Sequence, residues 1–226
     1  MHRLLTHALP ALLLASAPAA SAQVVISEIM YNPDSSEGGI GADAEPNQTE
    51  WLEIYNAGDE AVAIGGWYLQ DEDGQTAGLP ESATIAPGEA IVLIPGTQTA
   101  DDFRAAWETD DAKGFQVFAL AGWAVGDNPL SNLANGPSDT NEILTLRNAE
   151  GETIDEVNYD DENGWPTDSP DGASIVLRPD MLDVESNDEG SAWLRASANQ
   201  HGARTNTQTD DYNGEDTGSP GVVATE

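Results

Sequence analysis

Carboxylates dominate the side chains of this sequence that could do chemistry. The chain holds 41 Asp and Glu residues, three His and no Cys. His2 and His7 lie in an apolar leader, which leaves His201, in a polar C-terminal stretch, as the remaining imidazole. Nucleophilic catalysis by a Ser-His or Cys-His pair needs an imidazole beside the nucleophile, and zinc sites need several His or Cys ligands. Composition therefore argues against these classes, and we assign no catalytic, cofactor-binding or metal-ligating residue.

Glu28 and Glu53 stand out among the acids, because each interrupts a segment of apolar, strand-like character. A glycosidase needs two carboxyl groups about 5–10 Å apart in a cleft. A buried carboxylate is costly unless it is hydrogen-bonded or paired. Each glutamate could instead bond an Arg or backbone groups, or point outward. We favour this structural role and a protein that is not an enzyme, with a carboxylate-based secreted hydrolase as the competing class.

Three acidic turns offer oxygen ligands for calcium, which takes six to eight of them. They are Asp71–Gly74, Asp160–Gly164 and Asp210–Asp216. None completes an EF-hand loop, and so acidic a chain produces such clusters by composition alone. The prediction is no cofactor, with Ca²⁺ binding in these turns as the alternative.

Aromatic side chains form a second candidate feature. Trp51, Tyr55 and Tyr68 carry the parity opposite to the apolar residues of their strands. An exposed stripe of this kind could dock a glycan or a protein partner. Equally, the long acidic loops could cover it, and the sequence leaves both alternatives open.

Short β-strands must position these residues. Alternating or continuous apolar runs predict about nine strands. The clearest are Val24–Met30, Trp51–Tyr55, Val62–Leu69, Phe115–Leu120, Ile143–Arg147, Thr153–Tyr159 and Ser174–Leu177, with a further short one at Ala192–Leu194. Turn residues at 56–59 predict a hairpin, and those at 148–151 predict another. Phase breaks at Gly65-Gly66 and Asp155-Glu156 predict β-bulges.

One segment has helical periodicity. In Asp101–Glu108, Phe103 and Trp107 stand four residues apart on one face, and Thr99 or Asp101 could cap the helix. Residues 34–49 and 121–141 are rich in Gly, Ser, Asn or acids and predict long loops.

The N-terminus resembles a secretory signal peptide. Arg3 precedes the apolar stretch Leu4–Leu14, and Ala20-Ser21-Ala22 is a small-residue cleavage site. That stretch is too short for a permanent membrane anchor. We therefore expect cleavage after Ala22 and a secreted or periplasmic chain without a transmembrane segment.

The charge balance is extreme: the net charge is −34, and Lys113 is the only lysine. Acids at this density repel one another, and salt at about 1 M shortens the Debye length to roughly 3 Å and removes most of that repulsion. The composition indicates a halophilic source. Nucleic-acid binding is not expected, because phosphate contacts need clusters of Lys and Arg.

Several short motifs in a fixed order resemble the lamin tail domain family. They are Ile-Ser-Glu-Ile at 26–29 with Tyr-Asn-Pro at 31–33, Glu-Trp-Leu-Glu-Ile-Tyr-Asn at 50–56, Gly-Trp-Tyr-Leu-Gln-Asp at 66–71, Leu-Ser-Asn at 130–132, Val-Asn-Tyr-Asp-Asp at 157–161 and Pro-Gly at 220–221. The resemblance spans residues 24–221 and implies an all-β, immunoglobulin-like β-sandwich with long acidic loops and at most one short helix. The family offers no catalytic motif to transfer.

These observations predict three regions: a signal peptide at 1–22, a lamin-tail-like β-sandwich at 23–200, and an acidic C-terminal tail at 201–226 that completes or trails the domain. The predicted function is an exported, non-catalytic binding or cell-envelope-associated module whose partner is a protein or an envelope glycan. A calcium-stabilised adhesion or glycan-binding domain is the alternative, beside the hydrolase.

Overall fold

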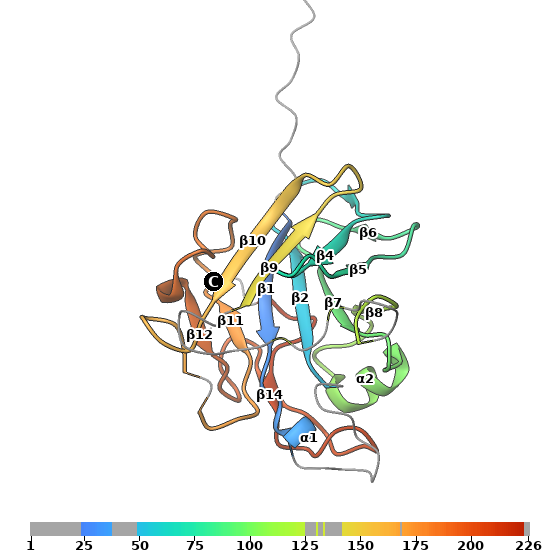
Figure 1. Cartoon of the computed structure of the whole chain (residues 1–226). Helices are drawn as coiled ribbons and strands as arrows, with labels where there is room; N and C mark the ends of the chain where they lie inside the picture. Colours follow the sequence, from blue (N-terminus) through green and yellow to red (C-terminus); the bar gives the residue numbers. More distant parts are fainter. Residues whose placement is uncertain are drawn as a thin grey trace, which may run out of the picture.

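The computed structural model describes residues 24–37, 49–124, 130, 133, 142–167 and 169–223. Strands dominate the regular structure and form two larger sheets and two strand pairs (Figure 1). This confirms the predicted all-β sandwich. The predicted signal peptide and most of the two long loops lie outside the described residues.

Six strands build the larger sheet: β1 (Val24–Met30), β2 (Trp51–Asn56), β7 (Ala90–Pro95), β8 (Gln116–Leu120), β11 (Ile175–Leu177) and β12 (Trp193–Arg195). They lie in the order β12-β11-β1-β2-β7-β8, and only β7 and β8 run parallel. Both β1 and β2 are buried along their whole length. These two central strands therefore have covered faces on both sides.

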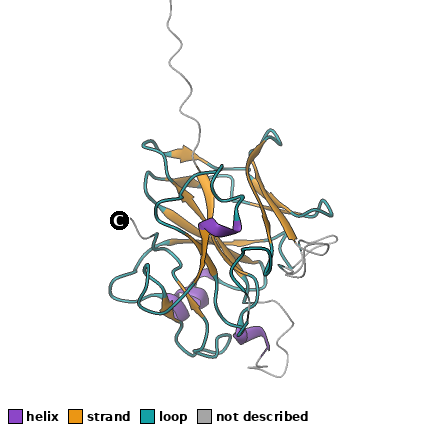
Figure 2. Cartoon of the chain, turned by 90° about the vertical axis from the view of Figure 1, so that its left-hand side faces the viewer, coloured by secondary structure: helices purple, strands orange, loops and turns teal. Residues whose placement is uncertain are grey.

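Four strands build the smaller sheet: β4 (Tyr68–Gln70), β5 (Thr76–Gly78), β9 (Glu142–Arg147) and β10 (Thr153–Tyr159). They lie in the order β10-β9-β4-β5. In Figure 1, β9 and β10 pass in front of β1 and β2, and Figure 2 shows the strands in layers from the side. The turn at 148–151 joins β9 to β10 as predicted, and the predicted slip is present, because the register shifts between Thr153 and Asp155.

The main hydrophobic core joins residues of both sheets, among them Ile26, Leu52, Leu144 and Val157, all without exposed surface. Leu130 and Leu133 also belong to it. The long segment predicted as loop at 121–141 thus supplies core residues as well as connections.

A second core lies where helix α2 (Ala100–Trp107) covers the larger sheet. Thr99 caps the helix by accepting a hydrogen bond from the Asp102 N–H, as predicted. Trp107 and Phe103 stack on one face and pack edge-on against Trp51, with ring centroids 5.6 Å and 5.9 Å away. Burial of large aromatic rings is the main source of stability at this end of the sheet.

Two local predictions were wrong. Residues 62–69 do not form one bulged strand: β3 (Val62–Ala63) pairs with β6 (Thr84–Ile85), and the chain then turns at Gly66 (φ 75°) into β4 of the smaller sheet. The strand breaks because glycine tolerates this left-handed backbone. Consequently the turn at 56–59 does not close a hairpin either, since β2 pairs with β1 and β7.

The C-terminal segment, residues 201–223, runs back across the domain. It contains the strand pair β13 (Arg204–Thr205) and β14 (Thr217–Gly218) and the fully buried Tyr212. It lies beside the single turn α1 (Asp34–Glu37) at the bottom of Figure 1, where the Ser35 hydroxyl accepts a hydrogen bond from the Asn213 N–H. A 3-10 turn, η1 (Gly190–Ala192), precedes β12.

Replacing Trp107 tests the second core. Trp107→Ala removes a ring that contacts Trp51, Phe103 and Tyr212 and should lower the free energy of unfolding by about 3–5 kcal/mol. Urea unfolding at constant molar salt measures the change. Asp101→Ala on the same helix is the control, because its side chain is 99% exposed, and should cost under about 1 kcal/mol. Equal midpoints for both variants would contradict the packing described.

Candidate functional site

Glu28 and Glu53 face one another across the centre of the larger sheet. The register pairs them directly, after a shift in β1 between Ile26 and Glu28. Their exposed fractions are 0% and 1%. Like charges directly opposite on neighbouring strands repel, so this pair needs compensation from its surroundings.

Glu28 receives its hydrogen bonds from two serines. Its Oε1 accepts from the Ser174 hydroxyl at 2.5 Å and from the Ser219 N–H at 2.7 Å, and its Oε2 accepts from the Ser219 hydroxyl at 2.6 Å. Burial raises the pKa of Glu28, although these bonds oppose the rise.

Glu53 is bonded by the strand beside it and by the C-terminal segment. Its Oε1 lies 2.7 Å from the Ser27 hydroxyl, and its Oε2 accepts from the Gly221 N–H at 2.7 Å. Burial, and next the charge of Glu28, raise the pKa of Glu53 to about 8. The raised pKa favours the protonated form of Glu53 near neutral pH, which limits the repulsion between the two carboxyl groups.

Arg204 is the cation whose field reaches both glutamates. Its Nε donates to the Trp107 carbonyl and its Nη2 to the Pro220 carbonyl, both at 2.6 Å. The ion pairs found within the described residues do not join it to either glutamate. Arg204 thus acts at a distance on the carboxylates while it holds two chain segments together.

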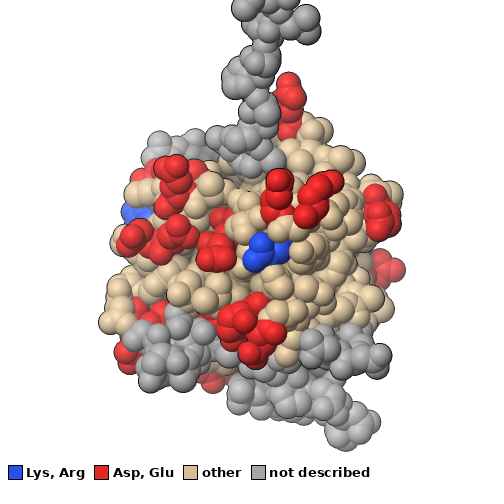
Figure 3. Space-filling model, turned by 45° about the horizontal axis from the view of Figure 1, so that its top comes forward, with Lys and Arg blue, Asp and Glu red and all other residues tan. Residues whose placement is uncertain are grey.

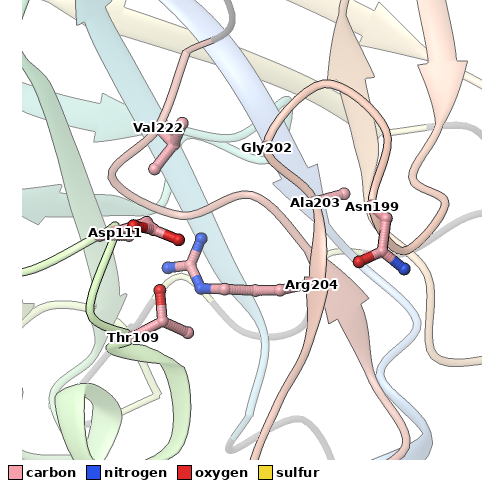
Figure 4. Close-up of a pocket in the computed structure, with 8 residues that line it drawn as sticks. Thr109, Asp111, Asn199, Gly202, Ala203, Arg204 and Val222 are labelled. Atoms are coloured by element: carbon pink, nitrogen blue, oxygen red, sulfur yellow. The ribbon is translucent and has the colours of Figure 1, made fainter.

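Arg204 also lines a cavity of about 450 Å³. In Figure 4 the Arg204 guanidinium extends between Thr109, Asp111 and Val222, and Asn199 lies near the base of the Arg204 side chain. Neither Glu28 nor Glu53 lines this cavity. A glycosidase pair would have to face a cleft, so the geometry favours the structural role predicted for the two glutamates, with hydroxyl and amide donors in place of a direct arginine bond.

The acidic turns that the sequence offered as alternative calcium sites direct carboxylate oxygens at protein donors. Asp71 accepts from the Gln75 N–H at 2.7 Å, and Asp160 from the Asp161 N–H at 2.8 Å. Asp216 accepts from the Asp34 N–H at 2.6 Å and from Asn206 at 2.9 Å. Within the described ranges, no group of three or more His, Cys, Asp or Glu side chains could hold a metal ion.

The predicted aromatic stripe is not an exposed face. Trp51 has no exposed surface, Tyr55 is 8% exposed, and Tyr68 is half-buried. Helix α2 supplies two rings that pack against Trp51, those of Phe103 and Trp107. The surface-docking alternative is therefore wrong for Trp51 and Tyr55. His201 is exposed in a turn with φ 48°.

Asp155 is a buried carboxylate that sequence reasoning did not single out. It lies in β10, and its Oδ2 accepts from the Ile26 N–H of β1 at 2.6 Å and from Asn187 at 2.8 Å. Burial raises its pKa to about 6 against these bonds. The side chain therefore links the two sheets at the place where β1 is bulged. The sequence signal that could have identified Asp155 was the phase break predicted at Asp155-Glu156.

The protonation of Glu53 makes stability depend on pH. Its pKa lies near 4.3 in the unfolded chain and at about 8 in the folded protein. The folded state holds the extra proton, so this contribution is complete below pH 4.3 and is lost as the pH rises to 8. The loss amounts to a few kcal/mol. Unfolding midpoints at pH 5 to 8.5, at constant molar salt, should therefore fall more steeply in the wild type than in Glu53→Gln.

Glu53→Gln keeps the shape of the side chain, and an amide can still accept from Gly221 and donate to the Ser27 hydroxyl. The matched control is Glu150→Gln, which removes one exposed charge. It should leave the pH slope of the wild type unchanged. A Glu53→Gln slope equal to the wild-type slope would show that Glu53 is ionised throughout.

The hydrogen bonds from Ser219 to Glu28 and from Gly221 to Glu53 form a clamp that holds the C-terminal segment on the sheet. A substitution at Ser219 tests this clamp. Ser219→Ala removes the hydroxyl that donates to Glu28 Oε2 and should lower the free energy of unfolding by about 1.5–3 kcal/mol, the range for a bond to a charged group. Limited proteolysis should also cut residues 201–223 earlier than in the wild type. Ser197→Ala, at an exposed position, is the control, and equal cutting of both variants would rule out the clamp.

The comparisons with known proteins agree with this architecture. No helix within the described ranges is long and apolar enough to cross a membrane. A search of curated proteins finds no match. The family model described as Lamin Tail Domain matches residues 17–161, more than half of the chain. The chain belongs to the lamin tail domain family.

Proposed function

We propose that the protein is an exported, non-catalytic binding or envelope-associated module of lamin-tail type from a halophilic source. The observation that carries the proposal is the burial and hydrogen bonding of the two carboxyl groups that were the candidates for catalysis. Inside the sheet, Glu28 accepts hydrogen bonds from Ser174 and Ser219, and Glu53 accepts one from Gly221. A carboxylate hydrolase built on them would lack an open cleft.

The surface supports adaptation to salt. In Figure 3 acidic side chains are scattered over the visible face in separate clusters, and basic ones show in small areas only. Four ion pairs occur in the described part of the chain, and all four join residues two to four positions apart. Such exposed pairs contribute little. Most acids of the described ranges therefore do not take part in these ion pairs, an arrangement that molar salt tolerates because it screens repulsion.

Export rests on the leader predicted from the sequence, with Arg3, the apolar stretch and the Ala20-Ser21-Ala22 site. The family assignment supports a module and not an enzyme, because a lamin tail domain provides a sandwich without transferable catalytic residues. Fold alone does not determine function, so the partner must come from experiment.

An affinity capture at molar salt tests the binding role. Residues 23–226, immobilised, are offered envelope and secreted fractions in 2–3 M NaCl, with EGTA or with Ca²⁺. We expect one saturable partner, a protein or an envelope glycan, that survives this salt, because screening removes binding by charge alone. Immobilised polyglutamate is the control for nonspecific acidity.

Two results would overturn the proposal. One is that the immobilised protein retains nothing beyond what the polyglutamate control also retains. The other is turnover of a polysaccharide or phosphoester by the purified chain that disappears on substitution of an Asp or Glu.

A further inference from the structure

A second buried acidic cluster lies at one end of the sandwich. It takes no part in the hydrogen bonds between the C-terminal segment and Glu28 or Glu53. Tyr31 follows β1 and Glu50 precedes β2, next to the register pair Met30 and Trp51. In the other sheet, Tyr159 and Glu142 are direct partners across β10 and β9. Each sheet thus contributes one tyrosine and one glutamate at the end of a strand pair.

The two tyrosines bring these strand ends together. The rings of Tyr31 and Tyr159 stack with centroids 5.2 Å apart. All four residues are at most 5% exposed: Tyr31, Glu50, Glu142 and Tyr159. Directly opposite residues of an antiparallel pair project to the same face, so the Tyr159 ring and the Glu142 carboxyl leave the smaller sheet on the same side.

The charge of Glu50 is poorly compensated. Glu50 Oε2 accepts one hydrogen bond from the Leu133 N–H at 2.8 Å. Burial raises the pKa of Glu50 well above its ordinary value, and the charge of Glu142 adds to the rise. No Lys or Arg of the described residues forms an ion pair with Glu50. A buried carboxyl with one hydrogen bond and a second carboxyl nearby requires either a proton or a cation.

The Tyr159 hydroxyl is a second and independent observation. Tyr159 is fully buried, and its hydroxyl has no hydrogen-bond partner. Yet Glu142 and Glu50 are the carboxylates that act on it most strongly. A buried hydroxyl normally bonds an available acceptor, so an unbonded hydroxyl under the influence of two carboxylates points to a missing ligand at this site.

We propose that Glu50, Glu142 and the Tyr159 hydroxyl form a site for one Ca²⁺ ion at this end of the sandwich. The donors are all oxygen, the preference of hard cations, and two carboxylates balance a divalent charge. Ca²⁺ fits better than Mg²⁺, which demands near-ideal octahedral geometry and keeps several waters. Carbonyl oxygens and water would complete the shell. The site is distinct from the three acidic turns and does not depend on any partner of the module.

Thermal unfolding measures Ca²⁺ binding directly. The chain is stripped with EGTA and titrated with Ca²⁺ from 1 µM to 10 mM in 2 M NaCl, so that ionic strength stays constant. The melting temperature should rise saturably, by about 5–10 °C at a hundredfold excess over Kd. Mg²⁺ should give a much smaller rise.

Matched variants locate the site. Glu50→Gln and Glu142→Gln should lose the Ca²⁺ response, and Tyr159→Phe should weaken it. Glu53→Gln, in the other buried pair, and Asp73→Asn, in an exposed acidic turn, should keep the full response. Because a glutamate variant could fail to fold, Tb³⁺ luminescence on the wild type gives a second readout. Tyr31 and Tyr159 should sensitise bound Tb³⁺, and Ca²⁺ should displace it.

The competing occupant is a proton on Glu50. In that case Ca²⁺ adds nothing to the melting temperature at constant ionic strength, and Tb³⁺ emission stays at the level of free solution. That result overturns the proposal. A response that persists in both folded glutamine variants overturns it as well, since the ion would then bind elsewhere.

Discussion

The structure depends on keeping two carboxyl groups in the middle of a dry sheet. Glu28 and Glu53 are direct cross-strand neighbours, and neither can be solvated because both faces of β1 and β2 are covered. Burial of such a pair is tolerable only when a proton removes one charge and hydrogen-bond donors surround the other. Ser219 supplies two donors to Glu28 and Gly221 supplies one to Glu53, and both residues lie at the far end of the chain. The carboxyl pair therefore explains why the C-terminal segment returns across the domain.

The scarcity of cations shapes the rest of the interior. With seven Lys and Arg against 41 acids, the chain cannot neutralise its buried carboxylates by ion pairing. Asp155 is satisfied by the Ile26 N–H and Asn187 instead. The arginines in turn bond backbone carbonyls: Arg104 that of Phe115, and Arg204 those of Trp107 and Pro220. An arginine that ties loops by neutral acceptors keeps its contribution in molar salt, where exposed ion pairs are screened.

Local patterns predicted the elements well and their pairing less well. The strands at 24–30 and 153–159 and the helix with its Thr99 cap follow from apolar periodicity and capping chemistry, which are properties of neighbouring residues. The break at Gly66 was misjudged, because a bulge and a change of sheet both need a left-handed glycine. The apolar strands singled out the glutamates, but the sequence left open whether they are buried or point outward. Their donors could not be predicted, since Ser219 lies 191 positions from Glu28 and no local pattern reports such a contact.

The contacts of the C-terminal segment also bear on how far the lamin-tail unit extends. The family match ends at residue 161, but β11 pairs with β1 inside the larger sheet, and Ser174 immediately before it bonds Glu28. A fold that stopped at the end of the match would leave β1 as an unprotected edge, which invites pairing with other chains. It would also leave Glu28 without its donors, at the full cost of a buried, unpaired carboxylate. The residues beyond the match are therefore required by the same carboxyl pair that the family motifs place in β1 and β2.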